Sequence, residues 1–467
     1  MLIKNTILYL AGNIVNRIGA FLLLPIYTTH LTVSEYGTLE LIYSIISVLS
    51  IILGAGLSHT TLRFYFDNDD EKFRNSVITT NAITTTIIAT VVGLILSFNN
   101  IGINNLLFNS KDSLNVVPII SAIIVFELTS EIHYAYIRAE QKVILYVLVS
   151  SIKLLTQLSV SIYLVVYLDM SILGVLLANL FCVFVVWAYL SLYVIKNCGI
   201  HFNFEILLPI FKYALPFALA SLIGVLLTNS DKLLIRYFIG LEDLGLYGLA
   251  MKFALMLSFV LLDPIQKSYG PYRFAIMRKK NSNSIYSGLA LLILDLSCVA
   301  VLLLICFLPY VVKFMADQAY WGAVSYIPML LLGVLFQAVN YNMQTGILIN
   351  KKTKYLLVII AIVTLFNIVL NYLFIPLYGL YAASIVYMSS YFLMTVLTFM
   401  ASQKERYIDY KYLRMVLSIG FLIFLSLVAI NNDLIIKITV LFLYVIYLYL
   451  NNNKEHLKTI ALIKNNT

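Results

Sequence analysis

Long apolar runs recur along this chain, and they constrain its fold more than any other feature. The runs are about 20 residues long and are separated by short polar segments, which is the length that an α-helix needs to cross about 30 Å of hydrocarbon. The strands of a membrane barrel would instead alternate in polarity over about 10 residues. The composition agrees, because 61% of the 467 residues are hydrophobic and 11% are charged, against about 25% charged in globular domains. The sequence therefore predicts an all-α integral membrane protein.

About fourteen transmembrane helices are predicted from these runs, and the even number places both termini on one side of the membrane. Basic residues concentrate in cytoplasmic loops, and about 22 of them, including Arg273, fall on that same side, against Lys111, Lys313 and Lys437 on the other. Both termini are therefore expected in the cytoplasm. The predicted spans are 7–30, 38–62, 76–98, 115–137, 144–167, 171–195, 213–238, 244–270, 284–308, 326–349, 355–375, 380–400, 415–430 and 435–450.

Charge and motifs exclude several classes of protein. The net charge of +9 is explained by this topology and by anionic lipid headgroups, so we expect no nucleic-acid partner. The sequence has no zinc spacing, phosphate-binding loop or catalytic triad, so we expect no enzyme activity, no catalytic residue, no metal site and no cofactor. The acidic segment 67–71, DNDDE, has the spacing of some metal-binding sugar-nucleotide enzymes, but basic neighbours in a short loop favour a solvated charged loop.

A weak internal repeat divides the chain into two halves. Glu35 and Gly37 follow the first span as Asp243 and Gly245 follow the seventh, an offset of 208 residues. Six spans per repeat give the halves the same orientation, related by an axis along the membrane normal. We therefore expect two six-helix bundles around a central cavity, at 1–200 and 201–405. Residues 406–467 would add two peripheral helices and a cytoplasmic tail.

Six cations are predicted to lie within the membrane spans, and two of them, Arg236 and Lys267, are close enough to span ends to reach the interface. A charged side chain at the centre of a membrane helix costs about 2.5 to 3.5 kcal/mol, so such residues usually face a bundle interior or an aqueous cavity. An anionic substrate would explain them, since guanidinium and ammonium groups bind phosphate oxygens strongly in a low dielectric. The alternative is structural pairing with nearby acids. The candidate substrate-binding cations are Arg17, Lys153, Lys232 and Lys252.

Uncharged polar side chains form stripes at helical spacing. Such side chains can contact a glycan, and they can equally hold helices together through hydrogen bonds of roughly 0.6 to 2 kcal/mol; both interpretations stay open. The candidate glycan contacts are Asn13, Asn16, Gln157, Gln337, Asn340, Tyr341 and Gln344, and Asn367 and Asn371 continue the stripe in the eleventh span.

Five acids lie within or beside the predicted spans. A desolvated carboxylate can exchange protons near neutral pH, which allows a proton or sodium site, whereas pairing with the interior cations would make the same groups counterions. The candidates for ion coupling or charge compensation are Glu127, Glu131, Asp231, Asp263 and Asp295.

The sequence resembles a known family of bacterial membrane proteins. The segments KYALPF (212–217), NSDKLLIRYFIG (229–240) and LGLYGLA (244–250), supported by LTVSEYGTLEL (31–41), LRFYF (62–66) and RAEQK (138–142), are similar to polysaccharide-unit flippases of the Wzx type. These belong to the multidrug, oligosaccharidyl-lipid and polysaccharide (MOP) exporter superfamily, and the resemblance covers about the first 400 residues.

The resemblance implies a multi-pass protein of the bacterial inner membrane that works by alternating access. Its cargo would be a polyprenyl-pyrophosphate-linked oligosaccharide repeat unit for O-antigen or capsule synthesis, and its partners would be membrane lipids, a polysaccharide polymerase and a chain-length regulator. Lipid II flipping and ion-coupled multidrug export within the same superfamily are alternatives. A membrane polymerase or ligase would carry a long outer loop with catalytic Arg or His, but the longest predicted outer loops, 99–113 and 310–325, hold only Lys111 and Lys313 as cations.

Overall fold

The computed structural model describes residues 19, 21–54, 56–100, 104, 116–430 and 433–464. These residues form helices joined by short connections, with no β-strand among them. Ten of the described helices are long and apolar enough to cross a membrane, or eleven if the bent pair Gln318–Ser325 and Ile327–Ile349 counts as one span. The prediction of an all-α, multi-pass membrane protein is confirmed. The count of fourteen stays a prediction, since most of the first expected span lies outside the described residues.

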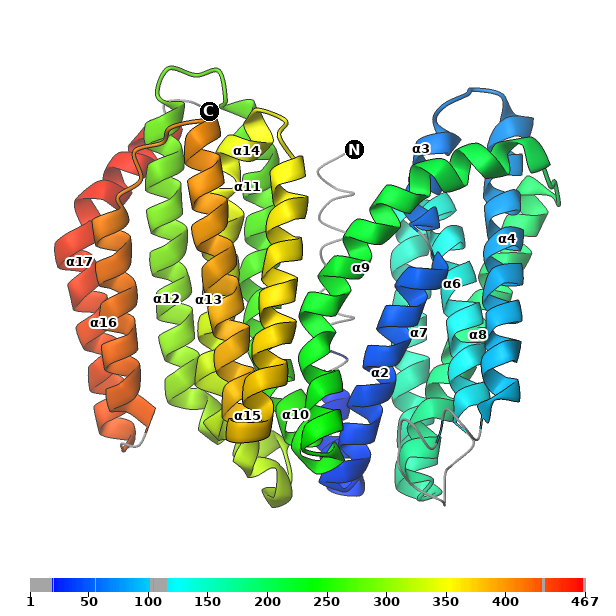
Figure 1. Ribbon diagram of the computed structural model, residues 1–467, viewed down its shortest axis with the longest axis horizontal. Helices are drawn as coiled ribbons and strands as arrows, with labels where there is room; N and C mark the ends of the chain where they lie inside the picture. Colours follow the sequence, from blue (N-terminus) through cyan, green and yellow to red (C-terminus); the bar gives the residue numbers. More distant parts are fainter. Residues whose placement is uncertain are drawn as a thin grey trace. The chain divides into compact units, whose positions relative to one another are not determined.

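The first of two compact units runs from Met1 to Asn229. Helix α6 is at its centre, since it packs against α3, α4 and α8, and Figure 1 shows these helices side by side. The described elements are α2 (Val33–Gly54), α3 (Leu57–Tyr65), α4 (Glu71–Phe98), α6 (Val117–Ala139), α7 (Val143–Ile162), the π-helical η1 (Tyr163–Tyr167), α8 (Ser171–Cys198), η2 (Phe204–Ile206) and the first part of α9 (Leu207–Phe238).

The acidic segment 67–71 begins a helix and forms ion pairs. Asp70 is the N-cap of α4 and accepts hydrogen bonds from the backbone N–H groups of Lys72 and Phe73, which satisfies donors that the first turn of a helix leaves unpaired. The Asp67 carboxylate lies 2.7 Å from the Arg63 guanidinium, and Asp69 pairs with Arg74. The carboxylates of this loop therefore serve the local structure.

The second unit runs from Ser230 to Thr467. Helices α16 and α17 pack against each other and against α12, and they form one edge of this unit in Figure 1. Its elements are the end of α9, α10 (Leu241–Leu257), the π-helical η3 (Ser258–Leu262), α11 (Asp263–Ala275), α12 (Ser282–Met315), η4 (Gln318–Ser325), α13 (Ile327–Met343), α14 (Thr345–Ile349), α15 (Lys354–Glu405), α16 (Tyr412–Ile430) and α17 (Leu434–Lys464).

Two helices of the second unit are interrupted. Helix α15 is 52 residues long and breaks at Gly379, whose φ of 60° and ψ of −138° are not helical, a conformation that glycine adopts without a Cβ clash. The break separates the two predicted spans 355–375 and 380–400. The segment from α10 to α11 contains the π-helical turn η3 immediately before Asp263 and Pro264. Proline has no N–H to donate, and the irregular turn ends two residues before Pro264.

Candidate functional site

A buried polar cluster lies in the second unit where the end of α9, α10 and α15 meet. Its members are Ser230 and Asp231 on α9, Tyr247 on α10, and Asn367, Asn371 and Ser390 on α15; none is more than 6% exposed. Polar groups at this depth cost free energy unless they are paired. The cluster is therefore a candidate for function as well as for helix packing.

Asp231 is the charged centre of this cluster. Its side chain is 1% exposed, and its carboxylate accepts hydrogen bonds from the Tyr247 hydroxyl and from the backbone N–H of Lys232, the latter over 2.8 Å. The charge of Lys232, the next residue along α9, also acts on this carboxylate. A buried carboxylate with neutral hydrogen-bond partners is stabilised when a proton or a cation neutralises it.

A chain of side-chain amides and hydroxyls continues the cluster along α15. Asn367 Oδ1 accepts hydrogen bonds from Ser230 Oγ at 3.1 Å and from Asn371 Nδ2 at 3.0 Å, while its own Nδ2 donates to Ser390 Oγ at 2.9 Å. Asn371 Oδ1 is buried and has no hydrogen-bond partner. The cluster thus presents an unused amide oxygen in addition to the Asp231 carboxylate.

The oxygen atoms of this cluster are ligands that suit a proton or a hard monovalent cation. Carboxylate, amide and hydroxyl oxygens are ligands for hard ions, whereas zinc and copper prefer nitrogen and sulfur. No group of three or more His, Cys, Asp or Glu side chains is assembled within the parts of the chain that the structure describes. The cluster therefore collects oxygen atoms of this kind in an otherwise apolar bundle.

The predicted cations differ in their surroundings. In the first unit, Lys153 Nζ on α7 lies 3.9 Å from Glu127 Oε1 on α6, and both side chains are partly exposed. In the second unit, Lys232 on α9 and Lys252 on α10 are partly buried. Arg17 lies outside the described residues, as do Asn13 and Asn16. The structure thus places the predicted cation Lys153 beside the predicted acid Glu127.

Three further predicted acids differ in their burial. Asp295 on α12 is 3% exposed, and its Oδ2 accepts a hydrogen bond from Asn452 Nδ2 at 2.8 Å and lies 3.0 Å from His456 Nε2. These contacts tie α17 to α12 and favour a structural role. Glu131 is exposed on α6, and Asp263 is partly buried at the start of α11.

The polar stripe on α13 contains Gln337, Asn340, Tyr341 and, at its end, Gln344. Asn340 is 4% exposed, and the other three are partly buried. The Tyr341 hydroxyl donates a hydrogen bond to the Gln266 carbonyl oxygen at 3.2 Å. Gln157 is partly buried on α7 in the first unit. Gln157 and the α13 stripe therefore belong to different units.

Arg273 has surroundings that differ from the cytoplasmic loop that the sequence predicts. Helix α11 extends to Ala275, and the Arg273 side chain is fully buried. Its guanidinium carbon lies 4.6 Å and 4.9 Å from the ring centroids of Tyr269 and Tyr341, and one terminal nitrogen donates to the Tyr341 carbonyl oxygen at 2.8 Å. Counting basic residues cannot identify such a site, because the two rings come from different helices.

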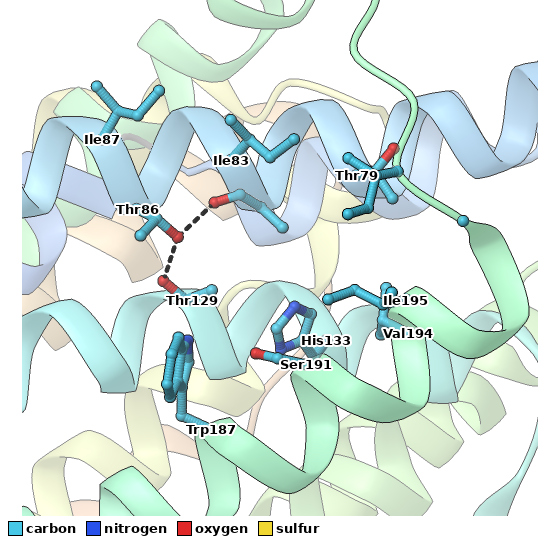
Figure 2. A pocket seen from close by; sticks show the side chains of 13 residues that line it. Thr79, Ile83, Thr86, Ile87, Thr129, His133, Trp187, Ser191, Val194 and Ile195 are labelled. Atoms are coloured by element: carbon cyan, nitrogen blue, oxygen red, sulfur yellow. Dashed lines mark hydrogen bonds between the residues drawn. The ribbon is translucent and has the colours of Figure 1, made fainter.

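The first unit contains a cavity of about 270 Å³ between α4, α6 and α8. Figure 2 shows α4 on one side, with His133 of α6 and Ser191 and Trp187 of α8 on the other. Thr86 and Thr129 are joined across it by a hydrogen bond of 2.8 Å. None of these residues was among the predicted site residues, since the sequence shows them as isolated polar positions in apolar runs.

The architecture is similar to that of solved membrane transporters. The lipid II flippase MurJ in an inward closed conformation superposes with a TM-score of 0.75 at 14% identity, covering 96% of this chain and 99% of that chain. A multidrug resistance MATE family transporter of the MOP superfamily, in an inward-facing conformation, gives a TM-score of 0.64 at 15% identity, covering 83% and 94%. No curated protein sequence matches the chain significantly.

The helical architecture therefore defines a multi-pass membrane protein with the fold of the MOP superfamily. The model of the family described as "Polysaccharide biosynthesis protein" matches residues 2–277, which is more than half of the chain. This protein belongs to that polysaccharide biosynthesis family.

Proposed function

We propose that this protein is a flippase that moves a polyprenyl-pyrophosphate-linked oligosaccharide repeat unit from the cytoplasmic to the outer leaflet of the bacterial inner membrane. Membership of the polysaccharide biosynthesis family carries the proposal, and the MOP fold supports it. The unit would serve synthesis of a surface polysaccharide such as O-antigen or capsule, together with a polymerase and a chain-length regulator. Both termini would lie in the cytoplasm.

Alternating access is the mechanism that this architecture supports. Two six-helix bundles, 1–200 and 201–405, would open in turn to the two sides of the membrane, with 406–467 at the periphery. The charged headgroup would cross between the bundles while the polyprenyl chain stays in the bilayer, because transferring a pyrophosphate through hydrocarbon without compensating charge is prohibitively costly.

Arg17, Lys153, Lys232 and Lys252 are the proposed contacts for the pyrophosphate. A phosphate oxygen could replace the Glu127 carboxylate beside Lys153, because that ion pair is long at 3.9 Å and partly exposed, and such pairs contribute little free energy. The glycan would contact amide and phenol groups. These belong to Asn13, Asn16, Gln157, Gln337, Asn340, Tyr341 and Gln344.

Asp231 is the proposed site of ion coupling. When a proton or sodium ion neutralises its carboxylate, the packing of α9, α10 and α15 around it becomes more favourable, and release of the ion reverses that preference. An ion gradient could in this way bias the exchange between conformations. Of the acids predicted for this role, Asp231 is the most deeply buried; Glu127, Glu131, Asp263 and Asp295 would act as counterions.

The cargo is tested by extracting lipids from cells that lack this protein. We expect a complete polyprenyl-pyrophosphate-linked repeat unit to accumulate on the cytoplasmic side, identified by mass spectrometry, and to disappear when the gene is restored. Accumulation of lipid II would instead support the second candidate function, which the likeness to MurJ favours. An unchanged lipid pool with increased sensitivity to cationic dyes would contradict both and indicate drug export.

A further inference from the structure

The cavity in the first unit has the dimensions and the lining of a lipid-chain site. It has a volume of about 270 Å³, and an apolar protein cavity of about 150 Å³ already holds benzene. We propose that it binds one acyl chain of a membrane glycerophospholipid, with the His133 imidazole donating a hydrogen bond to an ester carbonyl of that lipid. None of the residues that line it is among those proposed for cargo or ion binding.

The cavity extends along the axis of α4, and lipid chains lie in roughly this direction beside a membrane-spanning helix. Its wall on α4 extends from Thr79 to Ile87, which is about 12 Å at a rise of 1.5 Å per residue. Both α4 and α8 are long and apolar enough to span the membrane. One end of the cavity reaches Gly199 and Ile200, just beyond the last residue of α8, so the cavity extends inward from a helix end.

Two buried polar groups beside the cavity lack partners. His133 is 3% exposed and its Nδ1 has no hydrogen-bond partner, and the indole Nε1 of Trp187 is likewise buried and unpaired. The Thr86 and Thr129 hydroxyls, in contrast, are satisfied, since they lie within hydrogen-bond distance of each other and of the carbonyl oxygens of Ala82 and Val125. The indole N–H is a donor, and the imidazole Nδ1 is a donor in the tautomer that protonates it. Because buried donors are normally satisfied, both groups indicate that an acceptor enters this otherwise apolar space.

The mouth of the cavity indicates a lipid as the occupant. Ile87, Ile195 and Ile200 line it and are 55%, 46% and 68% exposed, and on membrane-spanning helices such side chains face hydrocarbon. The lining contains no lysine or arginine, which disfavours a phosphate group inside. An isoprenoid chain has no carbonyl for the imidazole, whereas an acyl ester supplies both the chain and the acceptor.

Filling the cavity tests the site directly. Ser191→Phe places a ring in the cavity, whereas Leu192→Phe alters the adjacent α8 residue, which is 69% exposed and does not line it. The proteins are reconstituted with a diacyl phospholipid, transferred to detergent and analysed by native mass spectrometry. We expect wild type and Leu192→Phe to retain one lipid and Ser191→Phe to lose at least tenfold in occupancy; equal retention in Ser191→Phe and wild type would overturn the proposal.

An ether lipid tests the hydrogen bond without requiring Ser191→Phe to fold. A dialkyl ether phospholipid with the same headgroup and chain length lacks the ester carbonyls. We expect wild type to retain the ester lipid at least threefold better than the ether lipid, and His133→Leu to retain the two equally. Equal retention by wild type would refute the role of His133. Displacement of the phospholipid by undecaprenyl phosphate at equal concentration would overturn the acyl assignment in favour of an isoprenoid.

Discussion

Ser230 Oγ on α9 donates a hydrogen bond to Asn367 Oδ1 on α15 over a distance of 3.1 Å. This bond joins the residue preceding Asp231 to the amide chain of Asn367, Asn371 and Ser390. A carboxylate and a set of neutral oxygen atoms, far apart in sequence, are thereby held in one buried part of the second unit. The first two predictions concern this cluster.

Replacing Asp231 by Asn should abolish ion-coupled transport while leaving the fold intact. The amide has nearly the same shape and can accept the Tyr247 hydrogen bond, but it cannot be neutralised by an ion. We expect at least a tenfold loss of gradient-driven flipping in proteoliposomes, with Glu242→Gln, an exposed acid on α10, as the matched control. If flipping by Asp231→Asn depends on the proton and sodium gradients as strongly as flipping by the wild type does, coupling at this residue is ruled out.

Substitutions of Asn371 and Asn367 should distinguish a loss of transport from a loss of stability. Asn371→Leu removes one donor to Asn367 together with the unpaired oxygen, so we expect a change in unfolding free energy below about 1 kcal/mol but a clear loss of transport. Asn367→Leu strips partners from Ser230, Asn371 and Ser390 and should cost roughly 1 to 3 kcal/mol. Thermal unfolding in detergent and flipping assays measure both effects; the prediction fails if Asn371→Leu transports normally.

Lys153 and Glu127 can be examined by a double-mutant cycle. Since their atoms are 3.9 Å apart and both side chains are partly exposed, we expect a coupling energy below about 1 kcal/mol. If Lys153 binds the cargo, Lys153→Met should reduce export whether or not Glu127→Gln is present. Recovery of export in the double variant would show instead that Lys153 serves only to neutralise Glu127.

Arg273 should be needed for stability in a way that lysine cannot replace. The Arg273 guanidinium lies within cation–π distance of both the Tyr269 and the Tyr341 ring, whereas an ammonium offers neither the plane nor the same reach. A desolvated cation–π contact contributes about 2 kcal/mol, so we expect Arg273→Lys to lower the unfolding free energy by about that amount. Arg278→Lys, at an exposed position beyond α11, is the control, and equal melting temperatures for the two variants would argue against a stabilising role of these two contacts.

The contact between α14 and α15 should depend on Gly346. A Cβ atom there would lie 2.4 Å from the Ser402 carbonyl oxygen, and a backbone oxygen inside a helix cannot move away freely. We expect Gly346→Ala to destabilise the protein by roughly 1 to 3 kcal/mol. At Gly420 a Cβ would meet nothing within 4 Å, so Gly420→Ala should be neutral or slightly stabilising; thermal unfolding of both variants distinguishes the two environments.

The sequence by itself determined the class of the protein, because hydrocarbon demands helices of a fixed length and their apolar runs can be read directly. It also identified Asp231 and the Asn367 and Asn371 pair, since polar groups in such runs are costly and therefore conspicuous. Local rules of the same kind account for the break at Gly379 and the irregular turn before Pro264.

Only the tertiary structure decided which of these polar groups meet. It placed Asp231 beside Tyr247, Lys153 beside Glu127, and Asp295 beside Asn452 and His456, and it buried Arg273 beside two tyrosines. It also formed the cavity at His133 from three helices. Helical spacing shows which face of a helix a residue occupies, but the partner on the other helix depends on packing between segments distant in sequence, which no local pattern contains.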